Sequence, residues 1–219
     1  GTTAGLDLPA MGTSPLKKDL IAEFDWFDDD NDEPDECAAH SHRPGPAVID
    51  RVVDAFAAGT TTNPDGTTGV NFIADYGQGG VFTGGALIDD ADGVIAGEIG
   101  DPDFTAIKAA NFASNREGYV RYVLNPHAFR GGAPTSGQAE IIGDDVIVSL
   151  GCFVDNDVYL ANTIMHEIGH NLSLRHGGDE DLNRKPNYLS VMNYRYQFDG
   201  VDTDCDAEGD GATVFSLGT

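Results

Sequence analysis

The stretch HEIGHNLSLRH, residues 166–176, decides how the surrounding chain must fold. His166 and His170 are four residues apart, so on an α-helix they lie about 40° apart around the axis and about 6 Å apart along it. Both imidazoles can therefore reach one zinc ion at about 2.0–2.1 Å. Glu167 follows the first histidine and can take a proton from an attacking water without binding the metal. His176 comes after the helix and supplies a third imidazole at a spacing that suits a tripodal site.

The residues around this stretch predict the helix that carries it. Asp157 can cap a helix that runs from Val158 to about Leu172. Apolar residues recur along it at helical spacing and predict a buried stripe of Ala161, Ile164, Met165, Ile168 and Leu172. Because that stripe packs against the rest of the protein, we expect the histidine-bearing face to point into a cleft. A chance H-E-x-x-H on a surface helix would lack this context.

A methionine-containing segment, SVMNY at residues 190–194, lies downstream of the three histidines. With it the chain resembles the metzincins, zinc peptidases in which H-E-x-x-H-x-x-G-x-x-H is followed by a methionine turn beneath the metal. The resemblance covers about residues 157–194 and implies that Met192 forms this hydrophobic base. Tyr194 is similar to the tyrosine of the astacin and serralysin branches, which binds the resting metal and then stabilises the oxyanion. A core methionine and a half-buried tyrosine are the alternative interpretations.

The resemblance implies a zinc-dependent endopeptidase. Zinc would be held by His166, His170 and His176, with Glu167 as general base. The partner would be a protein or peptide substrate that lies extended along an edge strand. We expect a monomer, and secretion is inferred only from this activity. The competing hypothesis is a calcium-stabilised binding or adhesion module with a structural or vestigial zinc site.

One position departs from the family pattern. Ser173 stands where the family has the glycine that ends the helix and turns the chain toward the third ligand. Glycine adopts a positive φ freely, whereas serine does so at a cost of order 1 kcal/mol. The departure leaves open an oxygen ligand from Asp179 or Asp181 in place of His176.

The rest of the chain predicts an α/β fold, or α+β in a looser sense. Strands are expected at residues 20–27, 70–75, 119–124 and 145–150, with helices from Pro46 to about Gly59 and over 104–113. This alternation favours a twisted, mostly parallel sheet with packed helices, similar to the metzincin arrangement with zinc in the cleft. We predict a catalytic part at 1–176 and a small irregular C-terminal subdomain at 177–219.

The protein is strongly acidic, with 37 acidic against 12 basic residues and a formal net charge of -25. Such a surface repels phosphates and anionic lipid, which argues against nucleic acid and membrane partners. No apolar run approaches the roughly 18–20 residues that span a bilayer. Adaptation to a high-salt environment, calcium sites, or a merely soluble acidic surface can each explain the charge.

The acidic loop at residues 28–36 is the clearest candidate for Ca²⁺, with Asp28, Asp30 and Asp32 as possible ligands. A solvated acidic loop is the alternative, because the glycine and terminal glutamate of an EF-hand are missing. The glycines at 77–85 lack the spacing of a nucleotide site.

Three cysteines, Cys37, Cys152 and Cys205, allow at most one internal disulfide and leave an odd thiol. The chain begins at Gly1 with no apolar signal core in residues 1–19, which suggests a processed or trimmed form. The remaining histidines, His40, His42 and His127, are expected to be exposed or structural.

Overall fold

Strands and helices alternate along the chain up to residue 171. The computed structural model describes residues 5–29, 38–89, 93–153, 156–206 and 209–216. Its strands are β1 (Asp19–Asp29), β2 (His40–Ser41), β3 (Asn71–Asp75), β4 (Leu87–Ile88), β5 (Val120–Asn125), β6 (Gly137–Ala139) and β7 (Asp145–Val148). Its helices are α1 (Pro46–Ala57), α2 (Pro102–Asn111) and α3 (Asp157–Asn171), with 3-10 turns η1 (Ser114–Arg116) and η2 (Gly151–Phe153). Every predicted strand and helix is present, while β2, β4 and β6 were not predicted.

The sheet is built around the long strand β1. The strands β3, β4 and β5 pair with β1 in parallel, and β7 pairs with β5 in parallel. At the far side β6 runs antiparallel to β7, and β2 runs antiparallel to the end of β1. The order β2-β1-β5-β7-β6, with β3 and β4 also on β1, makes a mixed but largely parallel open sheet. This confirms the predicted α/β class.

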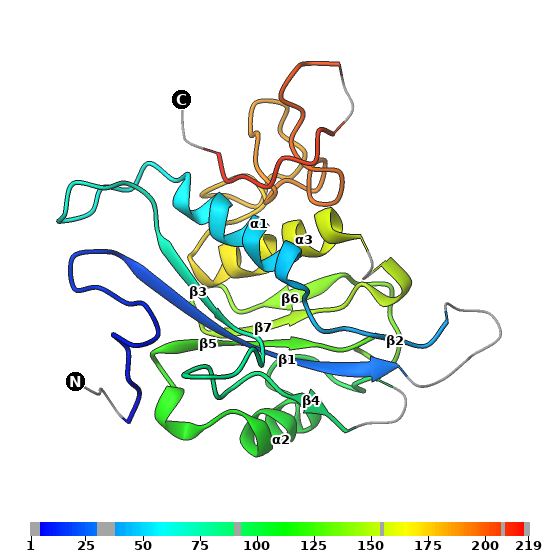
Figure 1. Cartoon of the computed structure of the whole chain (residues 1–219). Helices are drawn as coiled ribbons and strands as arrows, with labels where there is room; N and C mark the ends of the chain where they lie inside the picture. Colours follow the sequence, from blue (N-terminus) through cyan, green and yellow to red (C-terminus); the bar gives the residue numbers. More distant parts are fainter. Residues whose placement is uncertain (1–4, 30–37, 90–92, 154–155, 207–208, 217–219) are drawn as a thin grey trace.

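Alternating side chains of β1 give the sheet two apolar faces. Ala22 and Phe24 belong to the core that α1 and α3 share, whereas Ile21 packs in a second core with Phe104 of α2. Figure 1 shows α1 and α3 side by side on one face of the sheet and α2 on the other. Helices on both faces explain why the parallel strands are buried. In the described residues no helix is both long and apolar enough to span a bilayer.

Helix α3 is buried on every side, which differs from the predicted single stripe. Residues 160–171 are all buried. The helix contacts α1 and β7, and the segment after it crosses above it in Figure 1. Leu172 is 40% exposed, so its place in the buried stripe was wrong; it lies just past the last helical turn. A fully enclosed helix is a rigid support for the histidines that it carries.

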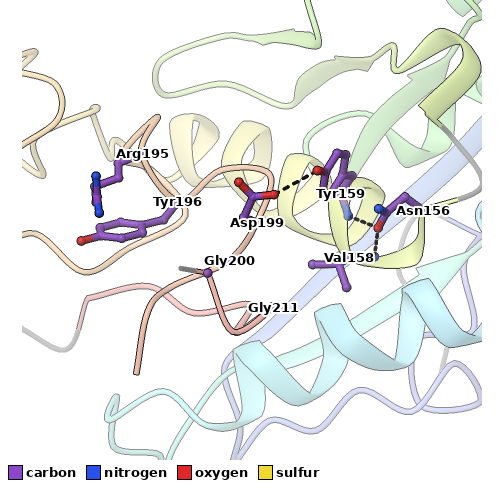
Figure 2. A pocket seen from close by; sticks show the side chains of 9 residues that line it. Asn156, Val158, Tyr159, Arg195, Tyr196, Asp199, Gly200 and Gly211 are labelled. Atoms are coloured by element: carbon purple, nitrogen blue, oxygen red, sulfur yellow. Dashed lines mark hydrogen bonds between the residues drawn. The ribbon is translucent and has the colours of Figure 1, made fainter. Parts of the chain in front are cut away.

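The N-terminus of α3 is capped by Asn156 and not by Asp157. The Asn156 side-chain oxygen accepts hydrogen bonds from the backbone N–H groups of Val158 and Tyr159, both at 3.1 Å (Figure 2). Asp157 is the first helical residue, where its negative charge interacts favourably with the positive end of the helix dipole. The predicted cap was therefore wrong by one position.

The described residues after α3 form turns, with isolated bridges between Arg175 and Gly178 and between Val201 and Ala212. The Val191 N–H donates to the Val214 carbonyl at 2.9 Å, and Phe215 packs against the core beneath α1 and α3. The segment thus folds back over the helix that carries the histidines. The division into 1–176 and 177–219 stays a prediction.

The states of the two described cysteines are consistent with the predicted single disulfide and odd thiol. Cys152, in η2, is disulfide-bonded. Cys205 is a free, exposed thiol. Cys37 lies outside the described residues.

A charged cluster is buried beside β1. Arg116 Nη1 donates to Glu23 Oε2 at 2.6 Å and to Asp75 Oδ2 at 2.8 Å, and Asp25 is fully buried nearby. One guanidinium thus faces three carboxyl groups. Burial raises the pKa of Glu23 to about 7, although the Arg116 charge opposes the rise. The folded protein therefore holds a proton on Glu23 that the unfolded chain releases above about pH 4.5.

Glu23→Gln tests this linkage. The unfolding free energy of the wild type, relative to that of the variant, is expected to fall by roughly 3 kcal/mol as pH rises from 4.5 to 7.5. The unfolding free energy falls with rising pH because, between pH 4.5 and about 7, the folded state binds a proton on Glu23 that the unfolded state does not. Urea unfolding at both pH values measures the unfolding free energy of each protein. The effect of the surface charges is common to both proteins, so it cancels when the value for the variant is subtracted from that for the wild type. Parallel curves for the two proteins would contradict it.

Candidate metal centre

Helix α3 presents His166 and His170 to one point. The Nδ1–H of His166 donates to the Val191 carbonyl, and that of His170 donates to the Leu174 carbonyl, each at 2.8 Å. Since each carbonyl can only accept, both Nε2 atoms carry free lone pairs. These two Nε2 atoms are 3.2 Å apart. Two nitrogens at about 2.0–2.1 Å from a tetrahedral zinc lie about 3.3 Å apart, so the pair fits that ion.

The third imidazole comes from the loop after α3. The ring of His176 lies 5.4 Å from that of His166 and 5.0 Å from that of His170, centroid to centroid. One ring nitrogen from each of the three histidines lies within 4.8 Å of the others. The Nε2 atom of His176 is buried and has no hydrogen-bond partner. A buried donor or acceptor is rarely left unpaired, so this orphaned nitrogen fits the role of a metal ligand.

Ser173 makes the turn that the family assigns to glycine. Its φ is 74°, in the left-handed region. The Ser173 N–H donates to the His170 carbonyl and the Leu174 N–H donates to the Gly169 carbonyl, both at 2.9 Å. This pair of bonds is the Schellman ending of a helix. With serine at this position the backbone still turns toward the third histidine. The difference from glycine is the steric cost of a positive φ.

Ser173→Gly is expected to raise the unfolding free energy by about 1 kcal/mol, because glycine removes the strain of the positive φ. Zinc content and activity should not change. Denaturant unfolding measures the gain. Ser173→Ala is the matched control, since it keeps the Cβ atom and should give no stabilisation. Equal stability of the glycine and alanine variants would argue against strain at this position.

Asp179 and Asp181, the alternative third ligands, do not belong to the group that the three histidines form. Asp181 Oδ2 accepts from Arg175 Nη1 at 2.6 Å, with the carboxylate 66% exposed. Asp179 is exposed as well. Among the residues that the structure describes, the metal-binding group on α3 consists of imidazoles alone.

Glu167 lies between α3 and the edge strand β6. Its side chain is 4% exposed, and burial raises its pKa to about 8. A Cβ atom placed on Gly137 of β6 would lie 2.5 Å from Glu167 Oε1. Any larger residue at 137 would therefore displace the carboxylate. This requirement could not be predicted from the sequence, because an isolated glycine between turns has many possible causes.

Burial keeps all three histidines neutral. It lowers the pKa of His166 to about 3, and it also lowers the pKa values of His170 and His176. Neutral imidazole is the form that binds a metal. The site therefore stands ready to bind a cation without first losing protons at neutral pH.

Met192 packs against α3, and Tyr194 lies beside two of the three histidines. Met192 is fully buried against α3, where a Cβ atom on Gly169 would overlap its Sδ atom. Tyr194 is 47% exposed, and its ring lies 5.6 Å from that of His166 and 4.3 Å from that of His176. Burial, and secondly the Glu167 charge, raise the pKa of Tyr194.

The predicted calcium ligands fall largely outside the described residues. Asp30 and Asp32 are not described, whereas Asp28 lies in β1 opposite Ser41 of β2. The Asp28 Oδ1 atom is buried without a hydrogen-bond partner. A calcium site there stays a prediction.

A separate hollow of about 690 Å³ lies where the N-terminal end of α3 meets residues 195–200, Gly209 and Gly211. Figure 2 shows the Tyr159 hydroxyl, which donates to Asp199 Oδ1 at 2.9 Å, on its wall. Among the described residues that line it there is no histidine, and the Asn156, Tyr159 and Asp199 side chains are engaged in hydrogen bonds of their own. We assign it no chemistry.

No family model matches the sequence, and no curated protein matches it. Among solved structures, metalloproteinase-II from Bacteroides fragilis is similar, with a TM-score of 0.39 and 13% identity over 94% of this chain and 55% of that protein. This chain thus spans about half the length of the metalloproteinase that it is similar to.

Proposed function

We propose that this protein is a zinc-dependent endopeptidase of the metzincin kind. The observation that carries the proposal is the convergence of three neutral imidazoles beside a buried carboxylate. His166 and His170 offer Nε2 atoms 3.2 Å apart, and His176 offers an orphaned one. Glu167 follows the first of them on the same enclosed helix.

The donor set fits zinc. Three imidazoles suit a borderline ion, and a catalytic zinc site has three protein ligands and one open position. The backbone carbonyls that hold His166 and His170 are the outer partners that usually orient such ligands. Zinc bound there supplies Lewis acidity, which acidifies water and polarises a carbonyl.

Glu167 would move the proton. Burial raises the pKa of this carboxyl to about 8, whereas a neighbouring dication would favour its ionised form. The carboxylate takes a proton from the water that adds to the scissile carbonyl carbon. It then gives this proton to the departing amine as the C–N bond breaks, which leaves a carboxyl group and a free amine.

Tyr194 would stabilise the charge on the carbonyl oxygen. Its ring lies against His166 and His176, and the residue is half-exposed. A phenol donor in this place can bind an oxyanion that develops in the transition state. Met192 would support α3 through its contact with Gly169 and take no part in the chemistry.

The strand β6 is the expected docking edge for substrate. In the described chain β6 pairs with β7 along one side. Its other side can accept an extended peptide through main-chain hydrogen bonds. Because Gly137 of β6 lies directly against Glu167, a peptide on this edge would pass the general base.

Metal removal tests the proposal. The purified protein is expected to cleave casein or gelatin, to lose this activity with a zinc chelator, and to regain it on addition of ZnCl₂. Metal analysis before and after chelation measures the bound zinc. Binding of zinc without cleavage of either substrate would favour the adhesion module, in which the metal is structural.

A further inference from the structure

A second group of three histidines lies outside the candidate metal centre. One ring nitrogen each from His40, His42 and His127 lies within 4.8 Å of the others. Their ring centroids are 4.6–5.6 Å apart. His42 is 1% exposed and His127 is 9% exposed. Of the two predicted possibilities, exposed or structural, burial therefore rules out the first for both residues. The group shares no residue with the centre on α3.

The topology of the sheet brings these histidines together. His40 and His42 are two residues apart where β2 pairs with the end of β1, so their side chains point to the same side. The His42 N–H donates to the Phe27 carbonyl at 2.9 Å, which extends this pairing. Strand β5 runs parallel to β1, with Asn125 opposite Trp26, so His127 emerges at the same end.

The backbone of His127 is fixed by three hydrogen bonds. Its N–H donates to the Gly93 carbonyl, and its own carbonyl accepts from the Ser149 Oγ–H and the Gly151 N–H. The distances are 2.9, 2.9 and 3.1 Å. A residue held in this way presents its ring in one place, as a metal ligand must.

The nitrogen positions match those of the centre on α3. His42 Nε2 and His127 Nδ1 are 3.2 Å apart, the same separation as the Nε2 atoms of His166 and His170. This is close to the roughly 3.3 Å expected for two ligands of a tetrahedral zinc. His40 Nδ1 contacts the Ala38 carbonyl at 2.8 Å, which repeats the carbonyl contacts of the α3 histidines.

His40 has a backbone carbonyl at each ring nitrogen. The Ala38 oxygen lies 2.8 Å from Nδ1, and the Gly151 oxygen lies 3.3 Å from Nε2. A neutral imidazole has one N–H and can donate to one carbonyl only. With Nδ1–H bound to Ala38, Nε2 presents a lone pair beside the Gly151 oxygen, an arrangement that suits a cation between the two atoms. The Gly151 carbonyl is thus the candidate fourth ligand.

The donors define the class of ion. No carboxylate belongs to this group in the described residues, which disfavours Ca²⁺ and Mg²⁺. Imidazole nitrogens suit zinc and its neighbours in the first transition row. Burial lowers the pKa of His42 to about 3, so its ring is in the neutral form that binds metal.

We propose that His40, His42 and His127 form a second, structural site for a divalent transition ion, zinc in the first place. The ion would fasten the short strand β2 and the end of β5 to η2. The site stands independently of the proposed peptidase activity.

Zinc stoichiometry tests the proposal. Protein stripped with a chelator, equilibrated with ZnCl₂ and desalted should hold two zinc ions per chain. The double variant His166→Ala/His170→Ala should hold one. Adding His40→Ala to that variant should remove the last ion, with affinity for zinc weakened more than 100-fold. His40 is the variant of choice because it is only partly buried, so its loss spares the core.

Ser41→Ala is the matched control. Ser41 lies between the two histidines of the segment, is exposed, and is not a member of the group. In the double-variant background it should keep its zinc. ZnCl₂ should also raise the melting temperature of the double variant and of its Ser41→Ala form, but not of the His40→Ala form. A double variant without zinc, or a His40→Ala form that binds as tightly as its parent, overturns the proposal.

Discussion

Glu167→Gln is expected to lower kcat for peptide hydrolysis by about 10²–10⁴-fold. Glutamine has nearly the same shape, but it cannot take a proton from water. The three imidazoles are untouched, so zinc content should equal that of the wild type. The melting temperature should not fall, because a neutral amide suits a buried position better than a carboxylate does.

Initial rates on a fluorogenic peptide, together with zinc analysis, measure this effect. Glu180→Gln is the matched control, since Glu180 is an exposed carboxylate that pairs with Lys185 beyond the third histidine. It should retain wild-type rates. A Glu167→Gln enzyme with more than about a tenth of the wild-type kcat would exclude Glu167 as the general base.

His176→Ala is expected to weaken zinc binding at the centre by more than about 100-fold and to abolish measurable activity. Loss of an outer partner already costs about 10–100-fold, so loss of a direct ligand should cost more. The remaining pair, His166 and His170, would have no third protein ligand among the described residues. Competition with a coloured zinc chelator measures the affinity.

Asp181→Asn serves as the comparison, because aspartate was the alternative third ligand. Its exposed ion pair with Arg175 contributes little to stability, so the variant should bind zinc and cleave peptide normally. If Asp181→Asn lost zinc and His176→Ala kept it, the ligand set would have to be reassigned to the carboxylate.

Long elements with strong periodicity could be predicted from the sequence. The spacing of His166 and His170 requires a helix, and apolar runs such as residues 145–150 indicate buried strands. The strand β6 could not be predicted, because Gly137–Ala139 has no apolar alternation and becomes a strand only by pairing with β7. The helix start was missed by one residue, since Asn156 and Asp157 are both good caps.

The candidate site was only partly visible in the sequence. The grouping of the three imidazoles with Glu167 could be predicted, because their residue types and spacing are visible in the sequence. The carbonyls of Val191 and Leu174, which orient the rings, have no such pattern, because every residue has a carbonyl. The grouping of His42 with His127 depends on the register between β1 and β5, which single-sequence reasoning did not supply.

The fold-back of the C-terminal segment has a consequence for the order of biosynthesis. A ribosome that has released residue 180 has already released every imidazole of the centre on α3. The Val191 carbonyl that aims His166 follows later, and it is itself held through Val214. A nascent chain therefore possesses metal-binding groups before it possesses the parts that align them. Alignment of His166 therefore has to wait until the chain has emerged from the exit tunnel as far as Val214.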